Sequence, residues 1–313
     1  MSPFKTSDVK GASNKGKELV IDVDDLSPRP KGTRSTIGVF DPDKFRSYAA
    51  FQNYANYFRE APLLVERAVD QPSLLDTNIP KWFVTKDWNF LLSNLDDAYE
   101  NLVKEFYANV IVEGEELKCW VREKSFSVTP IYLADILHIN RPIFTKPPVY
   151  NELNSDEEVL RETLGDNLEF LSHGKSVSVA SLSLELRLLT MIMFSNLYPL
   201  SSTRYMNLSR ALFLNDLIID EEIDVCSHIF HILAKTAKRA ALRNCLPFCH
   251  LISMILKLKG VHPSKDEHPY PQPSPINIRT LHASMSHTKK STKQESHATP
   301  GSSSSTSHAR MNN

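Results

Sequence analysis

Apolar residues recur at intervals of three and four along most of residues 39–260, which is the spacing of one face of an α-helix. The clearest case is the stretch LVKEFYANV, residues 102–110, where Lys104 and Glu105 fall opposite the apolar stripe. That stripe consists of Tyr99, Leu102, Val103, Phe106, Tyr107 and Val110. The pattern predicts an amphipathic helix with its aromatic residues inside and the two charges in water.

The same periodicity predicts helices at 42–58, 130–139, 156–164, 182–198, 205–218, 225–242 and 247–260. Asp41 is suited to cap the first of these, and Thr129 to cap the second. Ser155 and Glu158 have the spacing of a capping box for the third. Because the segment 182–198 is apolar nearly all round, we expect it to lie at the centre of the helices.

One stretch alternates with the period of a β-strand. Leu117, Cys119 and Val121 are separated by polar or amphipathic residues, and the chain then turns at Glu123 into residues 125–128. The predicted fold class is therefore mainly α, a single helical globular domain with one small β-hairpin.

The two ends have a different composition. Residues 1–38 are rich in Lys, Ser, Gly and Pro with few large apolar side chains, and residues 261–313 form a low-complexity segment rich in Ser, His and Lys. Such segments bury too little apolar surface to offset the entropy of ordering. We expect a disordered arm at 1–38, a helical domain at 39–260 and a disordered tail at 261–313.

Charge and cysteine content narrow the class of protein further. The 36 Lys and Arg nearly balance the 37 Asp and Glu, so there is no overall field to attract nucleic acid or an anionic membrane. The four cysteines do not form a disulfide framework, and the amino terminus has no apolar stretch of signal-peptide length. The most apolar stretch, residues 188–200, is too short to span a bilayer. We expect an intracellular protein with no membrane partner, in the nucleus or the cytoplasm.

The order of these elements resembles the putative plant transposon protein domain, a family of plant retrotransposon-derived sequences. The resemblance covers residues 45–262 and rests on LVKEFYANV, the hairpin with VREKSFSV, TPIYLADILHI and LPFCHLISMILKLKGV. In the turn of VREKSF, Glu123 stands where a glycine is more usual, which puts the tightness of the turn in question. The resemblance implies a plant host and a mobile-element origin, and it supplies no catalytic residues and no cofactor.

A group of soft ligands is a candidate metal site. His228 and His231 are one turn apart on a predicted helix, and Cys245 and Cys249 are one turn apart at the start of the next, so four ligands could converge as around zinc. A buried free cysteine is more often a small apolar residue of the core. We therefore favour core packing and predict no metal and no cofactor.

A basic stripe is the candidate nucleic-acid surface. Lys235, Arg239 and Arg243 recur every four residues along one helical face, with Lys238 beside them. Such a stripe can contact phosphates without reading sequence, although it is more commonly a solvated face.

No catalytic motif stands out. The patterns GxSxG, HExxH and GxGxxG are absent from the sequence. A nuclease or transposase needs carboxylates that converge on divalent metals. The acidic run from Asp216 to Asp224 lies between two predicted helices, where capping of the second helix is the more natural role.

The sequence therefore favours a non-catalytic, transposon-derived structural or interaction protein that self-associates in the manner of a capsid component or binds other transposon proteins. Phe51, Tyr54 and Tyr57 fall off the main stripe of their helix and are candidates for a contact surface, with ordinary partial exposure as the alternative. Two other functions are a nucleic-acid-binding protein that uses the basic stripe and tail, and a divalent-metal nuclease.

Overall fold

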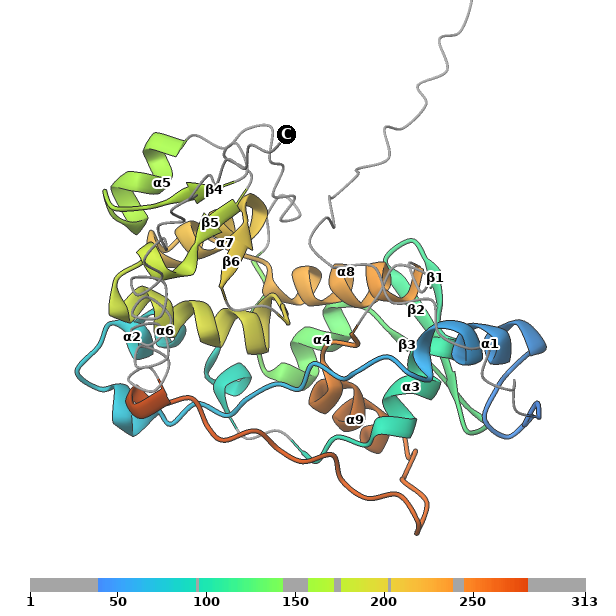
Figure 1. Cartoon of the computed structure of the whole chain (residues 1–313). Helices are drawn as coiled ribbons and strands as arrows, with labels where there is room; N and C mark the ends of the chain where they lie inside the picture. Colours follow the sequence, from blue (N-terminus) through green and yellow to red (C-terminus); the bar gives the residue numbers. More distant parts are fainter. Residues whose placement is uncertain are drawn as a thin grey trace, which may run out of the picture. The chain divides into compact units, whose positions relative to one another are not determined.

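The computed structural model describes residues 39–93, 96–142, 157–171, 176–201, 204–238 and 245–280 (Figure 1). The helices are α1 (Tyr48–Asn53), α2 (Ile79–Thr85), α3 (Glu100–Asn109), α4 (Pro130–Leu137), α5 (Glu157–Leu164), α6 (Leu184–Ile192), α7 (Leu208–Ile218), α8 (Val225–Lys238) and α9 (Cys249–Leu258). The strands are β1 (Ile111–Glu113), β2 (Glu116–Val121), β3 (Lys124–Val128), β4 (Phe170–Leu171), β5 (Ser176–Ser178) and β6 (Tyr205–Asn207). Within these ranges no helix combines the length and apolarity needed to cross a bilayer.

The predicted fold class is wrong, because the strands form two three-stranded antiparallel sheets, ordered β1-β2-β3 and β4-β5-β6. The chain is mixed α/β instead of mainly α with one hairpin. Strands β1, β4, β5 and β6 are two or three residues long, which is too short for alternation to be recognised. Strand β6 lies inside the predicted helix 205–218, which in the structure begins only at Leu208.

The hairpin of β2 and β3 is confirmed. Val121 pairs with Lys124, so Arg122 and Glu123 alone form the turn. Both residues have positive φ, 46° and 67°, as in the type I′ turn that suits the twist of a hairpin. The turn is therefore tight even though neither position is a glycine.

Helix α3 is the predicted helix of LVKEFYANV, and it lies at the centre of the core. It packs on β2, α8 and α9, and every residue from Leu102 to Asn109 is buried. The expectation that Lys104 and Glu105 face water is wrong, since their exposed fractions are 6% and 2%. Elements far apart in the sequence cover both faces of the helix, which its own periodicity does not reveal.

The predicted central helix 182–198 divides into two parts. Helix α6 covers Leu184–Ile192, and the chain continues as a π-helical turn over Met193–Leu197. Leu184 at its start is 43% exposed, so α3 occupies the centre more fully than α6 does.

The amino-terminal helix differs from its prediction. Ser47 instead of Asp41 caps it, accepting a hydrogen bond of 3.2 Å from the backbone N–H of Ala50. Phe51, expected on the outer side, is buried against Phe45 at 5.4 Å between ring centroids. Tyr54 and Tyr57 are half-buried against the core, so most of this proposed contact surface is already covered.

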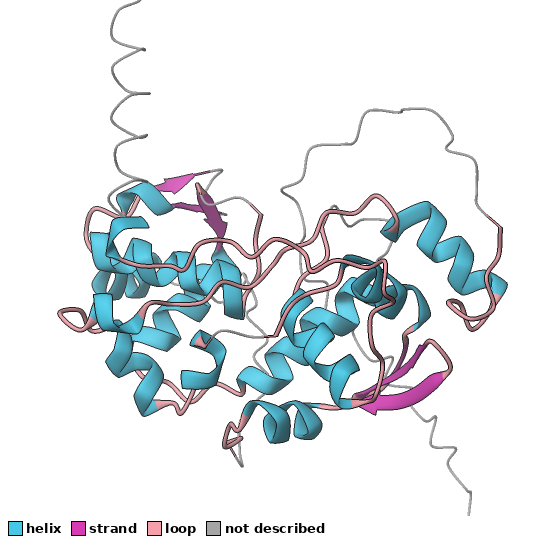
Figure 2. Ribbon diagram, turned by 90° about the horizontal axis from the view of Figure 1, so that it is seen from below, coloured by secondary structure: helices cyan, strands magenta, loops and turns pink. Residues whose placement is uncertain are grey.

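Residues 261–280, here called the strap, continue the packed chain beyond position 260, where the domain is expected to end from the sequence (Figure 1). The strap runs beside the extended segment 63–70, as the two neighbouring loops of Figure 2 show, and Val69 and Ile276 form an isolated parallel bridge. Ile276 is fully buried. This part of the predicted tail therefore completes the core, while residues 281–313 lie outside the described residues.

Candidate functional site

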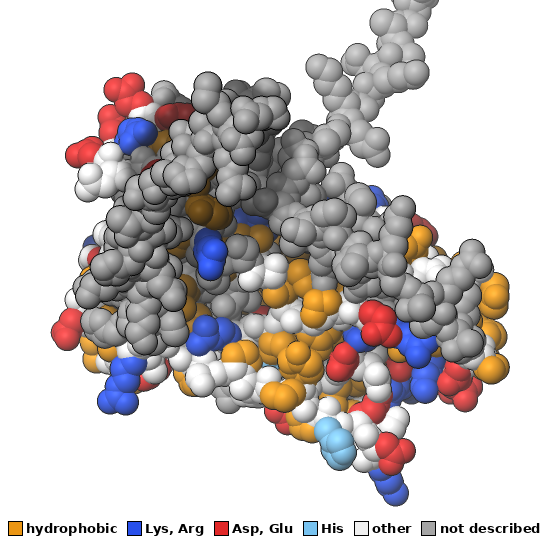
Figure 3. All heavy atoms as spheres, viewed as in Figure 1, with side chains coloured by type: hydrophobic (Ala, Val, Ile, Leu, Met, Phe, Trp, Pro, Cys, Tyr) orange, Lys and Arg blue, Asp and Glu red, His pale blue; other side chains and the backbone are white. Residues whose placement is uncertain are grey.

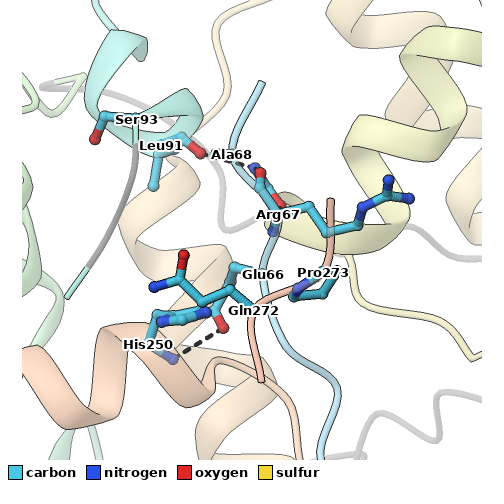
Figure 4. A pocket seen from close by; sticks show the side chains of 9 residues that line it. Glu66, Arg67, Ala68, Leu91, Ser93, His250, Gln272 and Pro273 are labelled. Atoms are coloured by element: carbon cyan, nitrogen blue, oxygen red, sulfur yellow. Dashed lines mark hydrogen bonds between the residues drawn. The ribbon is translucent and has the colours of Figure 1, made fainter. Parts of the chain in front are cut away.

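Buried polar side chains gather where segment 63–70, the π turn after α6, and the start of α9 meet (Figure 4). We call Glu66, Arg67, Asn196 and His250 the Glu66 junction. Glu66, Asn196 and His250 are all at most 5% exposed. Because buried polar groups are costly unless they are hydrogen-bonded, their partners indicate what the junction does.

Glu66 stabilises the first turn of α9. Phe248 precedes this helix in the left-handed region, with φ of 57°, and offers no side-chain cap. The two carboxylate oxygens of Glu66 instead accept the backbone N–H groups of His250 and Leu251, each at 3.0 Å. Burial raises the pKa of Glu66, while His250 and the two N–H groups oppose that shift. Glu66 thus caps a helix that lies far from it in the sequence.

Asn196 joins three segments from within the π turn. Its Oδ1 accepts the backbone N–H of Arg67 at 2.9 Å. Its Nδ2 donates to the carbonyls of Arg67 and Leu91 at 2.8 and 2.9 Å. The wider π turn places this amide so that it pairs with backbone on both sides, as a strand neighbour would.

The pocket at the junction is too small for an organic ligand. Gln272 and Pro273 of the strap complete its lining beside Glu66 and His250 (Figure 4). Its free volume is about 10 Å³, close to the space of one water molecule. Ligand pockets commonly enclose about 300 Å³ or more. The arrangement can hold segments together, and it does not present a carboxylate and an imidazole to a substrate.

A second polar cluster, the Arg122 clamp, links α3, the hairpin turn and the strap. Arg122 donates from Nε and Nη2 to the two oxygens of Glu105 at 3.0 and 3.2 Å, and from Nη2 to Glu267 at 2.6 Å. Its Nη1 donates to the carbonyl of His262 at 3.0 Å. Although burial lowers the pKa of Arg122, the two carboxylates raise it above its ordinary value. Burial raises the pKa of Glu105, and Arg122 counteracts this.

A third polar cluster surrounds Asp224, the last residue of the acidic run. Asp224 accepts the backbone N–H of Ser227 at 2.9 Å and so caps α8, as the sequence suggests. Arg141 donates to the same carboxylate at 2.6 Å. Burial raises the pKa of Asp224, but these partners outweigh it and the net shift is downward. Asp220 pairs with Lys86 at 2.9 Å instead of turning toward Asp224.

The candidate metal ligands on α8 have separate environments. His228 is buried, with its ring 4.5 Å from that of Tyr198 and 4.7 Å from that of Phe213. Burial lowers the pKa of His228 to about 3. His231 is exposed, and its Nδ1 lies 2.6 Å from the carbonyl oxygen of Ser227.

The candidate cysteine ligands are also buried. The thiol of Cys249 lies 3.2 Å from the carbonyl oxygen of Leu246 and 3.4 Å from that of Leu64, and burial raises its pKa. Cys245 is 6% exposed. Among the residues that the structure describes, no three His, Cys, Asp or Glu side chains are grouped so that they could hold a metal ion.

The candidate nucleic-acid stripe is described only in part. Lys235 is half-buried and Lys238 is exposed, both in the carboxy-terminal part of α8. Arg239 and Arg243 lie outside the described residues. The stripe therefore stays a prediction.

Sequence reasoning did not single out Glu66, Arg122, Asn196 or Glu267. A signal existed for two of them, because Glu66 interrupts the apolar run APLLVERAV, and Arg122 follows directly on the alternating strand. A charge among apolar residues is typical of a buried group with a partner, but nothing in the sequence identifies that partner.

Comparisons with the curated proteins and with the solved structures found no match. The model of the putative plant retrotransposon-related domain matches residues 84–262. That range includes α3, the β1-β2-β3 sheet, the Arg122–Glu105 pair and α9. It agrees with the resemblance carried by LVKEFYANV and the hairpin, and the chain belongs to this plant retrotransposon-derived family.

Proposed function

We propose that this transposon-derived protein is a non-catalytic structural or interaction protein that self-associates. The observation that supports a structural role is that the buried carboxylates bind other segments of the chain. Glu66, Glu105 and Asp224 each bind backbone N–H groups or an arginine from another segment. A carboxylate whose oxygens accept these bonds has fewer free positions for a substrate proton or a metal ion, which supports a structural role.

The pocket at the Glu66 junction supports the same proposal. A site for chemistry on a small molecule needs a cavity that excludes water and holds the substrate. At about 10 Å³, this pocket has room for a single water molecule. We therefore expect the function to depend on contacts of the outer surface, and on the face shown in Figure 3 apolar side chains gather in the lower middle of the view.

Light scattering of the purified chain over a wide range of concentration tests self-association. We expect the weight-average mass to rise above that of one chain as the concentration increases. A mass that stays at one chain up to the solubility limit would contradict the proposal. Repeating the series in raised salt separates apolar association, which persists, from attraction between charges, which salt screens.

The exposed position of Lys238 at the end of α8 favours nucleic-acid binding as a second candidate. Filter binding of single-stranded RNA in low and raised salt tests it. If the stripe contacts phosphates, replacing Lys238 by Ala weakens retention and reduces its salt dependence, whereas replacing the exposed Lys265 does not. Absence of retention even in low salt would exclude this candidate.

A further inference from the structure

The strap is held largely by its main chain. The N–H of Tyr270 donates to the carbonyl of Ala98 at 2.7 Å. The N–H of Ile276 donates to Ala68 at 2.8 Å, and its carbonyl accepts the N–H of Asp70 at 2.9 Å. Main-chain bonds of this kind are how a protein binds an extended peptide segment.

Side chains fix the position of the strap at both ends. Glu267 binds Arg122 at one end, and the fully buried Ile276 is the apolar anchor at the other. Between them, Arg67 donates from Nε and Nη2 to the carbonyl of Ser274 at 3.0 and 2.7 Å. Residues 271–275 are exposed, so the strap lies on the surface between its two anchors.

The composition of the strap suits this mode of binding. In HPYPQPSPI, residues 268–276, proline occupies every second position from 269 to 275. Proline fixes φ and has no N–H, so the free segment already favours an extended conformation and cannot form a hairpin with itself. Little conformational entropy is then lost when such a segment is bound.

We propose that the groove formed by residues 66–70 and 96–98 is a binding site for an extended proline-rich segment, and that it accepts the strap of a second copy of this chain in exchange for its own. A strap from another copy makes the same contacts with the groove, so exchange requires no new interaction. The hinge is the stretch after α9, where Gly260 has φ of 74° and residues 264–266 are exposed. The proposal deepens self-association and rests on it, since it names the segment that is exchanged.

A disulfide between groove and strap tests the exchange in the full chain. Gln272 donates to Asp97 at 3.2 Å, and both residues are exposed, so the pair Asp97→Cys and Gln272→Cys places one thiol on the groove and one on the strap without altering the core. The four native cysteines are buried and do not compete. After oxidation of a dilute sample we expect a cross-link within one chain, and after incubation at high concentration a covalent dimer on a non-reducing gel.

The two single-cysteine variants are the controls. A dimer yield from the double variant that never exceeds the yields of the single variants overturns strap exchange. If light scattering still shows association in that case, the proposed function stands and only this segment is wrong.

A labelled peptide of residues 266–280 tests the groove itself. In full-length Ile276→Asp the internal strap loses its buried anchor, so we expect the peptide to bind saturably and at least about tenfold more tightly than to the wild-type chain, where the tethered strap competes. A peptide that carries the same Ile276→Asp change should not bind. Failure of the unchanged peptide to bind overturns the proposal.

Circular dichroism establishes whether Ile276→Asp folds. If it does not, Glu267→Ala replaces it, because this change removes the bond of the internal strap to Arg122 and leaves residues 66–70 and 96–98 of the groove unaltered. The same binding result is expected, and the same failure would count against the groove.

Discussion

At the scale of single residues, the informative position is Glu105. A carboxylate in the middle of a buried helix is tolerated when an opposite charge and further hydrogen bonds surround it. Arg122 supplies both, with two N–H groups directed at the two oxygens of Glu105. The pair therefore explains how Glu105 can be buried within a helix whose residues from Leu102 to Asn109 are all buried.

Replacing Glu105 by Gln should lower the free energy of unfolding by about 2 kcal/mol, because one hydrogen bond to the Arg122 cation is lost and the charge is no longer balanced. Urea denaturation measures this. The control is Glu162→Gln, an exposed change on α5, which should shift stability by less than about 0.5 kcal/mol. Equal stability of the two variants would show that the clamp contributes nothing.

The hairpin turn allows a stabilising change. Glu123 has φ of 67°, which costs an L-residue roughly 1 kcal/mol and costs glycine almost nothing. Glu123→Gly should therefore raise the free energy of unfolding by about 0.5 kcal/mol after the added freedom of the unfolded chain is counted. Thermal unfolding followed by circular dichroism measures the shift.

Arg122→Gly is the matched control in the same turn, since φ is also positive there. That change should destabilise the protein because the ion pairs with Glu105 and Glu267 are lost. If both glycine variants shift stability in the same direction, backbone strain does not distinguish the two positions.

At the scale of elements, the start of α9 depends on a distant segment. Phe248 provides no cap, and two of the first N–H groups of the helix are satisfied by Glu66. The helix is thus coupled to segment 63–70, which also carries the strap. A substitution of Glu66 should therefore destabilise the first turn of α9 more than the rest of the helix.

Glu66→Ala should destabilise the chain by about 3 kcal/mol, because it leaves the N–H groups of His250 and Leu251 buried without acceptors. Hydrogen exchange should be faster at these two amides than in the rest of α9. Glu66→Gln, which keeps one acceptor oxygen, should have a smaller effect. Uniform exchange along α9 in the alanine variant would argue against the capping role.

At the scale of the whole molecule, the burial of His228 links stability to acid. Burial, with smaller contributions from Arg210 and His231, lowers its pKa from 6.5 to about 3. In the pH range between these values the unfolded chain binds a proton there and the folded chain does not. This contribution to stability is complete above pH 6.5 and is lost as the pH falls toward 3, at up to about 1.4 kcal/mol per pH unit.

His228→Phe removes that dependence and keeps an aromatic ring beside Tyr198 and Phe213. Urea denaturation of both proteins between pH 7 and pH 4 should give a smaller loss of stability for the variant. The pKa of Asp224 is lowered overall, so protonation of Asp224 in acid also reduces the stability of the folded protein. This loss is the same in both proteins and does not affect the difference between them. Parallel curves for the two proteins would contradict the assignment.

Features that depend on near neighbours in the chain can be predicted from the sequence alone. Thr129 caps α4 as expected, with the N–H of Tyr132 at 3.1 Å from its hydroxyl, and the alternation from Leu117 to Val121 gives strand β2. The family was also visible, because LVKEFYANV and the hairpin are local stretches. These features rest on hydrogen bonds and side-chain periods that span a few residues.

Which charges are buried, and which groups they bind, follows from long-range contacts of the folded chain. Glu105 and Arg122 are 17 residues apart in the sequence, and Glu66 and His250 are 184 residues apart. Contacts over such separations form only when the chain folds. The short strands β4 to β6 and the seating of the strap depend on the same long-range pairing. A periodic pattern shows which side of a helix can be buried, but the number of faces that are covered depends on the elements that pack around it.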